Sequence, residues 1–231
     1  MGRWPARPSI SAIRSSRGLR ARNGSSGWPE RRKDGHPPLA RLELPNDTVS
    51  LARYLIGKLL VRELPEGVAS GRIVETEAYI VGDAAGHTYG GMTRRNRSLF
   101  LERGHAYIYL AYGSSYMLNV SSEAPGTGAG VLIRALEPLE GIPVMRLNRG
   151  VERLRDLARG PGRLAAALRI DRSLDGLDLC REGPLWLGHG DREPGEIGQS
   201  IRIGVSRYAN RLLRFYLRDS PFVSGPRSLA V

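Results

Sequence analysis

Hydrophobic residues recur at helical spacing soon after residue 42. A helix is predicted there, because these residues fall on one face and the polar run Asn46-Asp47-Thr48 in front of them offers an N-cap. The residues at this spacing are Val49, Ala52, Leu55, Ile56 and Leu59. Residues 141–169 show a second helical pattern, which Gly160-Pro161-Gly162 interrupts. We therefore expect the folded part of the chain to begin near Leu42.

Short hydrophobic runs bounded by turn residues predict strands along much of the remaining chain. Pro65-Glu66-Gly67 separates two of them, and Gly113-Ser114-Ser115 separates the two strands of a hairpin. The predicted strands cover residues 60–63, 68–79, 106–112, 116–121, 130–136, 200–205 and 212–217. Because most of these strands follow one another in sequence, with helices at intervals, the pattern indicates an α+β fold with a largely antiparallel sheet. We expect a single domain over residues 42–231.

Residues 1–41 show no hydrophobic periodicity and mix arginine with serine, glycine and proline. Within residues 1–40, nine basic residues stand against two acids, a net charge of +7. Such a segment cannot bury enough surface to offset its conformational entropy, so we interpret residues 1–41 as a basic, disordered tail. A transit peptide, an additional nucleic-acid-binding arm and a misassigned start codon are alternatives.

Composition narrows the class of protein. The 231 residues carry a formal net charge of +12 and a pI near 10.6, which favours a polyanionic partner. No uncharged apolar run approaches the ~20 residues of a membrane span, so no membrane partner is expected. The single cysteine, Cys180, excludes an intramolecular disulfide and a cysteine-rich zinc site. The four histidines stand apart, so no metal site is predicted.

Two carboxylates alternate along the predicted strand 68–79. In a regular strand Glu75, Glu77 and Tyr79 share one face, and a solvent-facing polar side is the ordinary explanation of such a pattern. The predicted hairpin is rich in tyrosine, and Tyr112 abuts its turn, where a large aromatic side chain gains little burial. An exposed aromatic at a hairpin tip, on a basic protein, has the character of a wedge inserted between base pairs.

Several motifs, in the same order, resemble the alkyladenine (3-methyladenine) DNA glycosylase family from about residue 42 to 225. They are Glu75–Tyr79 with His87, Tyr107–Gly113, Leu118-Asn119, Leu132–Pro138, Gly160–Leu164 and Arg214–Tyr216. That family extrudes a damaged purine nucleotide from duplex DNA and hydrolyses its N-glycosidic bond, which leaves an abasic site. The resemblance implies the same activity here. It also implies a curved, largely antiparallel sheet with flanking helices and a protruding hairpin that acts as the wedge.

The resemblance further implies roles for single residues. Glu77 corresponds to the catalytic carboxylate, Arg134 to its partner, and the main-chain carbonyl of Ile203 to a third ligand of the attacking water. Tyr112 corresponds to the intercalating wedge. The residues that correspond to contacts of the flipped nucleotide are Tyr79, His87, Tyr109, Asn119 and Leu132. The arginines placed to contact phosphates are Arg94, Arg95 and Arg97. A structural salt bridge for Arg134 and a loop-packing role for His87 are the alternatives.

The implied reaction needs no cofactor and no metal. We expect a monomer that acts on double-stranded DNA containing damaged purines: 3-methyladenine, 7-methylguanine, hypoxanthine or ethenoadenine, which the sequence does not rank. Neither Lys33 nor Lys58 lies near a motif, so the amine that a glycosylase/lyase requires is missing and a monofunctional enzyme is expected. A non-catalytic binder of damaged or bent DNA and an RNA-binding domain are the rival interpretations. The expected location is the bacterial cytoplasm, at the nucleoid, with organelle import through the tail as the alternative.

Overall fold

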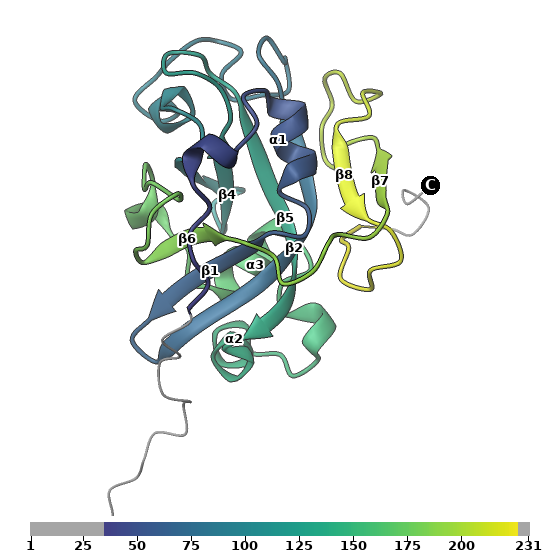
Figure 1. The fold of residues 1–231 in the computed structure, drawn as a ribbon. Coiled ribbons are helices and arrows are strands. Elements are labelled where there is room, and N and C mark those ends of the chain that lie inside the picture. Colours follow the sequence, from purple (N-terminus) through teal and green to yellow (C-terminus); the bar gives the residue numbers. More distant parts are fainter. Residues whose placement is uncertain (1–34, 226–231) are drawn as a thin grey trace, which may run out of the picture.

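Two long antiparallel strands, β2 (Gly67–Tyr79) and β5 (Gly130–Glu140), form the centre of the structure (Figure 1). The protein is described here from a computed structural model, which covers residues 35–225. Within that range one sheet has the strand order β3-β4-β5-β2-β1-β6, and β7 and β8 attach to it through β2. The other strands are β1 (Leu59–Leu64), β3 (Ala106–Ala111), β4 (Ser115–Ser121), β6 (Leu185–Gly188), β7 (Ile197–Ser200) and β8 (Arg214–Leu217).

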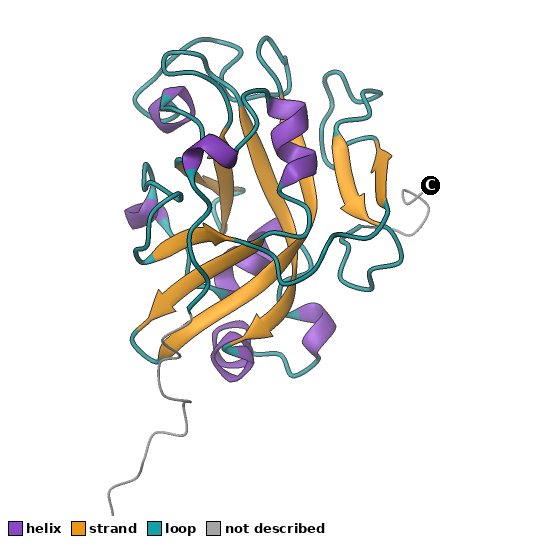
Figure 2. Cartoon of the chain, in the orientation of Figure 1, coloured by secondary structure: helices purple, strands orange, loops and turns teal. Residues whose placement is uncertain are grey.

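Every pairing of these strands is antiparallel, as the sequence pattern predicted. The curled sheet is accompanied by the helices α1 (Thr48–Tyr54), α2 (Ile142–Arg149) and α3 (Pro161–Ala167), and Figure 2 shows the helices in purple around the orange strands. Four short 3₁₀ helices complete the described elements: Arg41–Glu43, Arg97–Phe100, Leu154–Asp156 and Arg172–Leu174. The α+β class and the curved sheet are therefore confirmed.

Strand β2 has neighbours along both of its edges. Its first half pairs with β1, residues 75–77 pair with β8, and β5 follows its other edge. The pairing with β5 shifts register around Glu75, which marks irregularity of the bulge type and bends the strand. Residues 69–78 are all buried, and Glu75 and Glu77 are 0% exposed. The interpretation of a solvent-facing polar side is therefore wrong, because the side chains of Arg134 and Arg214 and the segments at Ile203 and Ser224 cover that side.

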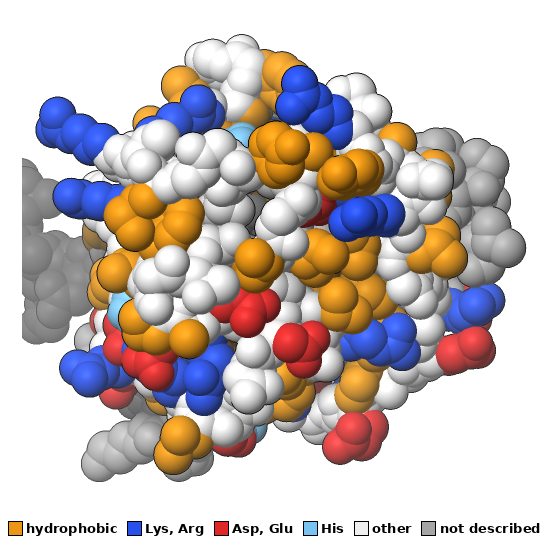
Figure 3. Space-filling view, turned by 90° about the horizontal axis from the view of Figure 1, so that it is seen from above, with side chains coloured by type: hydrophobic (Ala, Val, Ile, Leu, Met, Phe, Trp, Pro, Cys, Tyr) orange, Lys and Arg blue, Asp and Glu red, His pale blue; other side chains and the backbone are white. Residues whose placement is uncertain are grey.

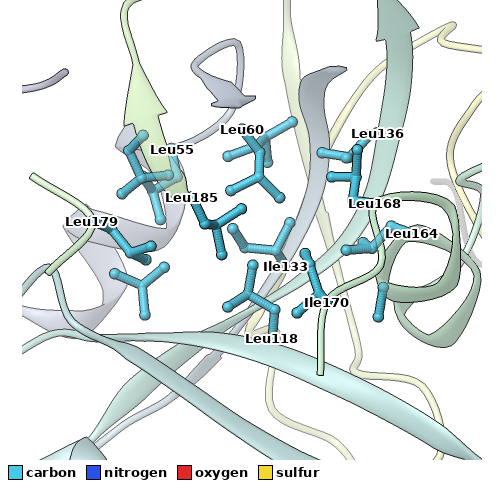
Figure 4. Packing of buried hydrophobic residues seen from close by; sticks show 14 of the residues in the cluster. Leu55, Leu60, Leu118, Ile133, Leu136, Leu164, Leu168, Ile170, Leu179 and Leu185 are labelled. Atoms are coloured by element: carbon cyan, nitrogen blue, oxygen red, sulfur yellow. The ribbon is translucent and has the colours of Figure 1, made fainter. Parts of the chain in front are cut away.

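The helices pack on the sheet through apolar side chains. Asp47 caps α1 by accepting a hydrogen bond from the Ser50 N–H at 2.9 Å, and Leu51 and Ala52 of that helix are buried. Helix α3 approaches β4 so closely that a Cβ on Gly162 would lie 2.9 Å from the Cβ of Ser115. Leucine and isoleucine side chains from α1, α3 and the sheet meet in the core between these layers (Figure 4).

Some predicted boundaries need correction. Residues 201–205 are not a strand, since β7 ends at Ser200 and the chain turns at Gly204, whose φ is +76°. The helical pattern over 141–169 resolves into α2, a 3₁₀ turn and α3. Residues 35–41, counted with the tail, pack on the domain: Leu39 is fully buried and its N–H donates to the Leu187 carbonyl at 2.8 Å. The rest of the predicted tail, residues 1–34, lies outside the described residues.

No helix of residues 35–225 combines the length and the apolar character that crossing a membrane would require.

Candidate active site

Glu77 is completely buried near the end of β2 and receives hydrogen-bonding groups on both of its oxygens. Its Oε1 accepts the backbone N–H of Ile203 at 2.7 Å and lies 3.1 Å from Nη1 of Arg134. Its Oε2 accepts the hydroxyl of Tyr79 at 3.0 Å. The three partners come from β5, from β2 itself and from the loop between β7 and β8. Sequence segments far apart in the chain thus meet at one carboxylate.

Burial raises the pKa of Glu77 above the ordinary value of 4.5 for a glutamate. Arg134 opposes that rise by its positive charge, and the Ile203 N–H and the Tyr79 hydroxyl oppose it by donating to the charged form. The same burial, together with the nearby charge of Glu77, raises the pKa of the Tyr79 phenol. Tyr79 therefore stays a neutral hydrogen-bond donor, and Glu77 is a carboxylate of increased basicity.

A cavity of about 500 Å³ lies beside this carboxylate. Tyr79, Arg134 and Ile203, the three residues that contact Glu77, all line it. The other residues assigned to the flipped nucleotide also line it: His87, Tyr109, Asn119 and Leu132. A volume in this range is typical of pockets for small organic ligands, such as a single base. The structure therefore brings all of the predicted pocket residues together around one hollow.

Aromatic rings form one wall of the cavity. Tyr107 and Tyr109, on the same face of β3, are stacked with their centroids 5.5 Å apart. His87 meets Tyr109 edge-on at 4.4 Å, and its Nδ1 shares a hydrogen bond with the Tyr107 hydroxyl at 2.9 Å. Burial, and to a smaller degree the charge of Arg95, lower the pKa of His87, so the imidazole is neutral at pH 7. The wall is a set of neutral π faces.

Two further wall residues come from neighbouring strands. Asn119 of β4 and Leu132 of β5 are paired in the sheet, so their side chains stand at the same level. The Nδ2 of Asn119 donates to the Tyr107 carbonyl at 3.3 Å, which fixes the orientation of this amide. Both side chains are almost fully buried. Their rigid placement suits them to discriminate between bases by shape.

Tyr112 stands at the tip of the β3–β4 hairpin, at the rim of the cavity, and is 90% exposed. The Ser114 N–H donates to the Ala111 carbonyl at 3.1 Å, and the two residues between them, Tyr112 and Gly113, have φ of +51° and +70°. Positive φ at both central positions is typical of tight hairpin turns, but glycine or asparagine ordinarily occupies the first one. The turn holds a large aromatic ring in solvent in a backbone conformation that tyrosine rarely adopts.

The arginines before the hairpin differ in position. All three are exposed, but Arg95 lines the cavity with its guanidinium carbon 5.8 Å from the centre of the Tyr109 ring, whereas Arg94 and Arg97 do not line it. Figure 3 shows a face of the molecule where lysine and arginine side chains lie among exposed hydrophobic ones. The predicted phosphate contacts of Arg94, Arg95 and Arg97 stay predictions.

The loop that carries Ile203 is held by a buried ion pair. The guanidinium of Arg202 binds both carboxylate oxygens of Asp83, and both side chains are fully buried. Arg202 also donates to the Ala78 carbonyl at 3.0 Å and lies 4.6 Å from the centre of the Tyr79 ring. Neither partner was singled out from the sequence, because an aspartate in a loop and an arginine in an arginine-rich chain give no signal.

The sequence pattern also did not indicate the buried hydrogen bonds around Glu75. Glu75 accepts the Nε of Arg134 at 2.9 Å, the Nε of Arg214 at 2.7 Å and the backbone N–H of Ser224 at 2.6 Å. Its position two residues before Glu77 was the one available signal.

Within residues 35–225, no group of three histidine, cysteine, aspartate or glutamate side chains is arranged to hold a metal ion.

Comparison with known proteins agrees with this geometry. The family model described as methylpurine-DNA glycosylase (MPG) matches residues 43–221. A Mesorhizobium japonicum protein, provisionally named a 3-methyladenine DNA glycosylase, is 78% identical over 198 residues, which are 86% of this chain and 95% of that protein. The human protein named DNA-3-methyladenine glycosylase is 45% identical over 193 residues, covering 76% of this chain and 64% of its own length.

Proposed function

The chain belongs to the methylpurine-DNA glycosylase family and is accordingly a DNA glycosylase of base-excision repair, and we propose that it hydrolyses the N-glycosidic bond of purines flipped out of duplex DNA. The proposed substrates are alkylated purines such as 3-methyladenine and 7-methylguanine, and the neutral lesions hypoxanthine and ethenoadenine. We further propose that the enzyme is a monomer without lyase activity.

One observation carries this proposal: a buried carboxylate of raised pKa lies directly beside an aromatic cavity of about 500 Å³. A flipped purine is flat, so it can stack between Tyr79, Tyr109 and His87. A base that carries a positive charge gains a cation–π contribution from the tyrosine faces. Asn119 narrows the same space, which disfavours a normal guanine with its exocyclic 2-amino group.

In the proposed reaction a water molecule bound by Glu77, by Arg134 and by the main-chain carbonyl of Ile203 attacks the anomeric carbon of the sugar. The new C–O bond forms as the C–N bond to the base breaks, and the bond's electron pair leaves with the base. Glu77 takes the proton from the water and its negative charge stabilises the oxocarbenium-like transition state. A cationic base becomes neutral as it leaves, so one carboxylate suffices. A neutral base such as hypoxanthine must also receive a proton, and no residue is assigned to that step.

Flipping must precede this chemistry, because the duplex shields the N-glycosidic bond from water. Flipping costs a few kcal/mol, since the nucleotide must be unstacked and unpaired. Tyr112 is proposed to enter the space that the nucleotide vacates. Its exposure, its place at the cavity rim and the tight turn beneath it support that role.

The absence of lyase activity is proposed from the position of the amines. Among residues 35–225 the only lysine is Lys58, whose Nζ lies 4.6 Å from the centre of the Tyr54 ring, and it does not line the cavity. A lyase needs an amine that attacks the sugar to form a Schiff base. No such group is placed beside Glu77 in this part of the chain.

Incubation of the purified chain with duplexes that each contain a single lesion tests the proposal. We expect release of the free base and an alkali-labile abasic site, with no strand cleavage before alkali and no adduct trapped by borohydride. Binding without release of any base would show a non-catalytic binder. A trapped adduct would show an amine nucleophile.

A further inference from the structure

Glu75 is a second buried carboxylate beside the candidate active site, and the mechanism above does not use it. It is 0% exposed, and two arginines and Ser224 surround it. Its Oε1 accepts the Nε of Arg134, the Nε of Arg214 and the Ser224 hydroxyl, the last at 3.0 Å, and its Oε2 accepts the Ser224 backbone N–H. Any buried carboxylate needs hydrogen bonds and ion pairs of this kind, so these contacts by themselves do not indicate a role in the reaction.

The connection to the reaction runs through Arg134. This guanidinium has three nitrogens, and the structure gives each a different partner: Nε contacts Glu75, Nη1 contacts Glu77 at 3.1 Å, and Nη2 donates to the Ser224 hydroxyl at 3.3 Å. Arginine and a carboxylate ordinarily form two parallel hydrogen bonds when nothing else competes. Here Glu75 and Ser224 occupy the nitrogens that would complete such a pair with Glu77.

We propose, on the premise of the glycosylase function above, that Glu75 is a positioning residue: by holding Nε of Arg134 it leaves a single guanidinium nitrogen for Glu77 and so keeps the negative charge of Glu77 available to the attacking water and the sugar. A carboxylate gripped by two guanidinium nitrogens would be a weaker base and would present fewer free lone pairs. Glu75 also repels the charged form of Glu77 from two residues away on the same strand, which acts in the same direction.

The groups that face Glu77 come from every element around it. On β2 they are Tyr79 and Glu75, on β5 Arg134, and on the loop after β7 the Ile203 N–H. Arg214 of β8 lies opposite Glu77 in the strand register, and its guanidinium binds Glu75. Tyr109, across the cavity, has its pKa raised to about 12, chiefly by burial, and stays neutral. The charges that act directly on Glu77 are those of Arg134 and Glu75, and Arg214 acts through its ion pair with Glu75. Arg202, over the Tyr79 ring, is paired with Asp83.

The experiment compares Glu75→Gln, Glu75→Asp and Arg214→Gln in single-turnover excision of 7-methylguanine as a function of pH. The midpoint of the acid limb reports the protonation of Glu77 in the free enzyme when the rate is measured at subsaturating enzyme. Glu75→Gln removes a negative charge and frees Arg134, so its midpoint should fall by about 1 unit. Arg214→Gln removes a positive charge and should move the midpoint upward. Glu75→Asp keeps the charge, so its midpoint should stay nearer to that of the parent.

If Glu75 is a positioning residue, Glu75→Gln and Arg214→Gln should shift the midpoint in opposite directions. Structural damage alone would lower the plateau rate of both variants and leave both midpoints unchanged. Should Glu75→Gln not fold, the upward shift of Arg214→Gln tests the same claim. Glu196→Gln, in an exposed pair with Arg218 at 3.0 Å, is the control and should behave as the parent. Midpoints that all coincide with the parent would overturn the inference. A parent that releases no base would instead overturn the proposed function.

Discussion

The backbone N–H of Ile203 donates to Oε1 of Glu77 at 2.7 Å, although 126 residues separate the two in the chain. The resemblance to the family implied a different contribution from Ile203, a carbonyl ligand of the water. The observed contact adds a second one, since the amide stabilises the charged carboxylate. The loop after β7 is therefore part of the site's electrostatics as well as its shape.

The first prediction concerns the ion pair that holds this loop. Asp83→Asn leaves the buried guanidinium of Arg202 without its counter-charge, and breaking a buried pair from one side costs about 3–5 kcal/mol. We expect the free energy of unfolding in urea to fall by this amount. Glu196→Gln breaks an exposed pair, so its effect should stay below about 1 kcal/mol. Equal losses in the two variants would show that the Asp83–Arg202 pair does not anchor the loop.

The second prediction concerns Tyr112. Tyr112→Ala keeps the backbone conformation but removes the exposed ring, so the free energy of unfolding should change by no more than about 0.5 kcal/mol. Stopped-flow fluorescence of a lesion duplex should nevertheless show poorer capture of the flipped nucleotide.

Tyr208 supplies the matched control for this variant. It is another exposed tyrosine with positive φ, +47°, and it does not line the cavity. Tyr208→Ala should capture the flipped nucleotide as the parent does. If Tyr112→Ala instead lost several kcal/mol of stability, Tyr112 would be a core residue and the wedge role would be wrong.

The third prediction concerns pH. Excision needs Glu77 deprotonated, and burial raises its pKa, so the rate on a cationic base should fall as pH drops through a value above 4.5. Below that midpoint the rate should decrease tenfold per pH unit, as expected for one proton. A single-turnover pH series with 7-methylguanine measures it. A rate that stays constant to below pH 4.5 would contradict the assigned base.

The fourth prediction concerns the N-terminal segment. Deleting residues 1–34 removes a net charge of +7, nine basic residues less two acids, and leaves Leu39 in place. DNA affinity should weaken at low salt. The slope of log affinity against log salt concentration should become less steep, by about 0.9 for each phosphate contact that is lost. Single-turnover excision should be nearly unchanged.

Deleting residues 1–40 removes the same net charge and also the buried Leu39. Loss of a fully buried leucine should cost about 1.5–3 kcal/mol of folding free energy. Differential scanning calorimetry of the two truncated proteins should therefore give different melting temperatures. Equal temperatures would mean that the packing of residues 35–41 contributes nothing to stability.

Sequence alone predicted the strands that carry the site, because alternating hydrophobic residues and the turns at 65–67 and 113–115 mark them locally. It could not predict that Glu75 is buried. Alternation shows that Glu75 and Glu77 share a side of β2, but what covers that side depends on Arg214 and Ser224, more than a hundred residues away.

The segment 201–205 is a second case in which contacts with distant residues overrule the local sequence pattern. Its alternation of apolar and polar residues predicted a strand, yet Arg202 turns inward to the buried Asp83 and the chain bends at Gly204. Leu39 was assigned to a tail because residues 1–41 show no hydrophobic periodicity. Its burial depends on β6, a strand that the sequence pattern did not predict.

The central claim is that Glu77 activates the water, and Glu77→Gln tests it most directly. The variant keeps the size of the side chain but can neither take a proton nor oppose a positive charge. We predict that it binds a lesion-containing duplex at least as tightly as the parent, because a buried anion near DNA has been removed. Excision of 3-methyladenine and hypoxanthine in single turnover should fall by at least about 10²-fold and become nearly undetectable. Excision at the parent rate would contradict the account.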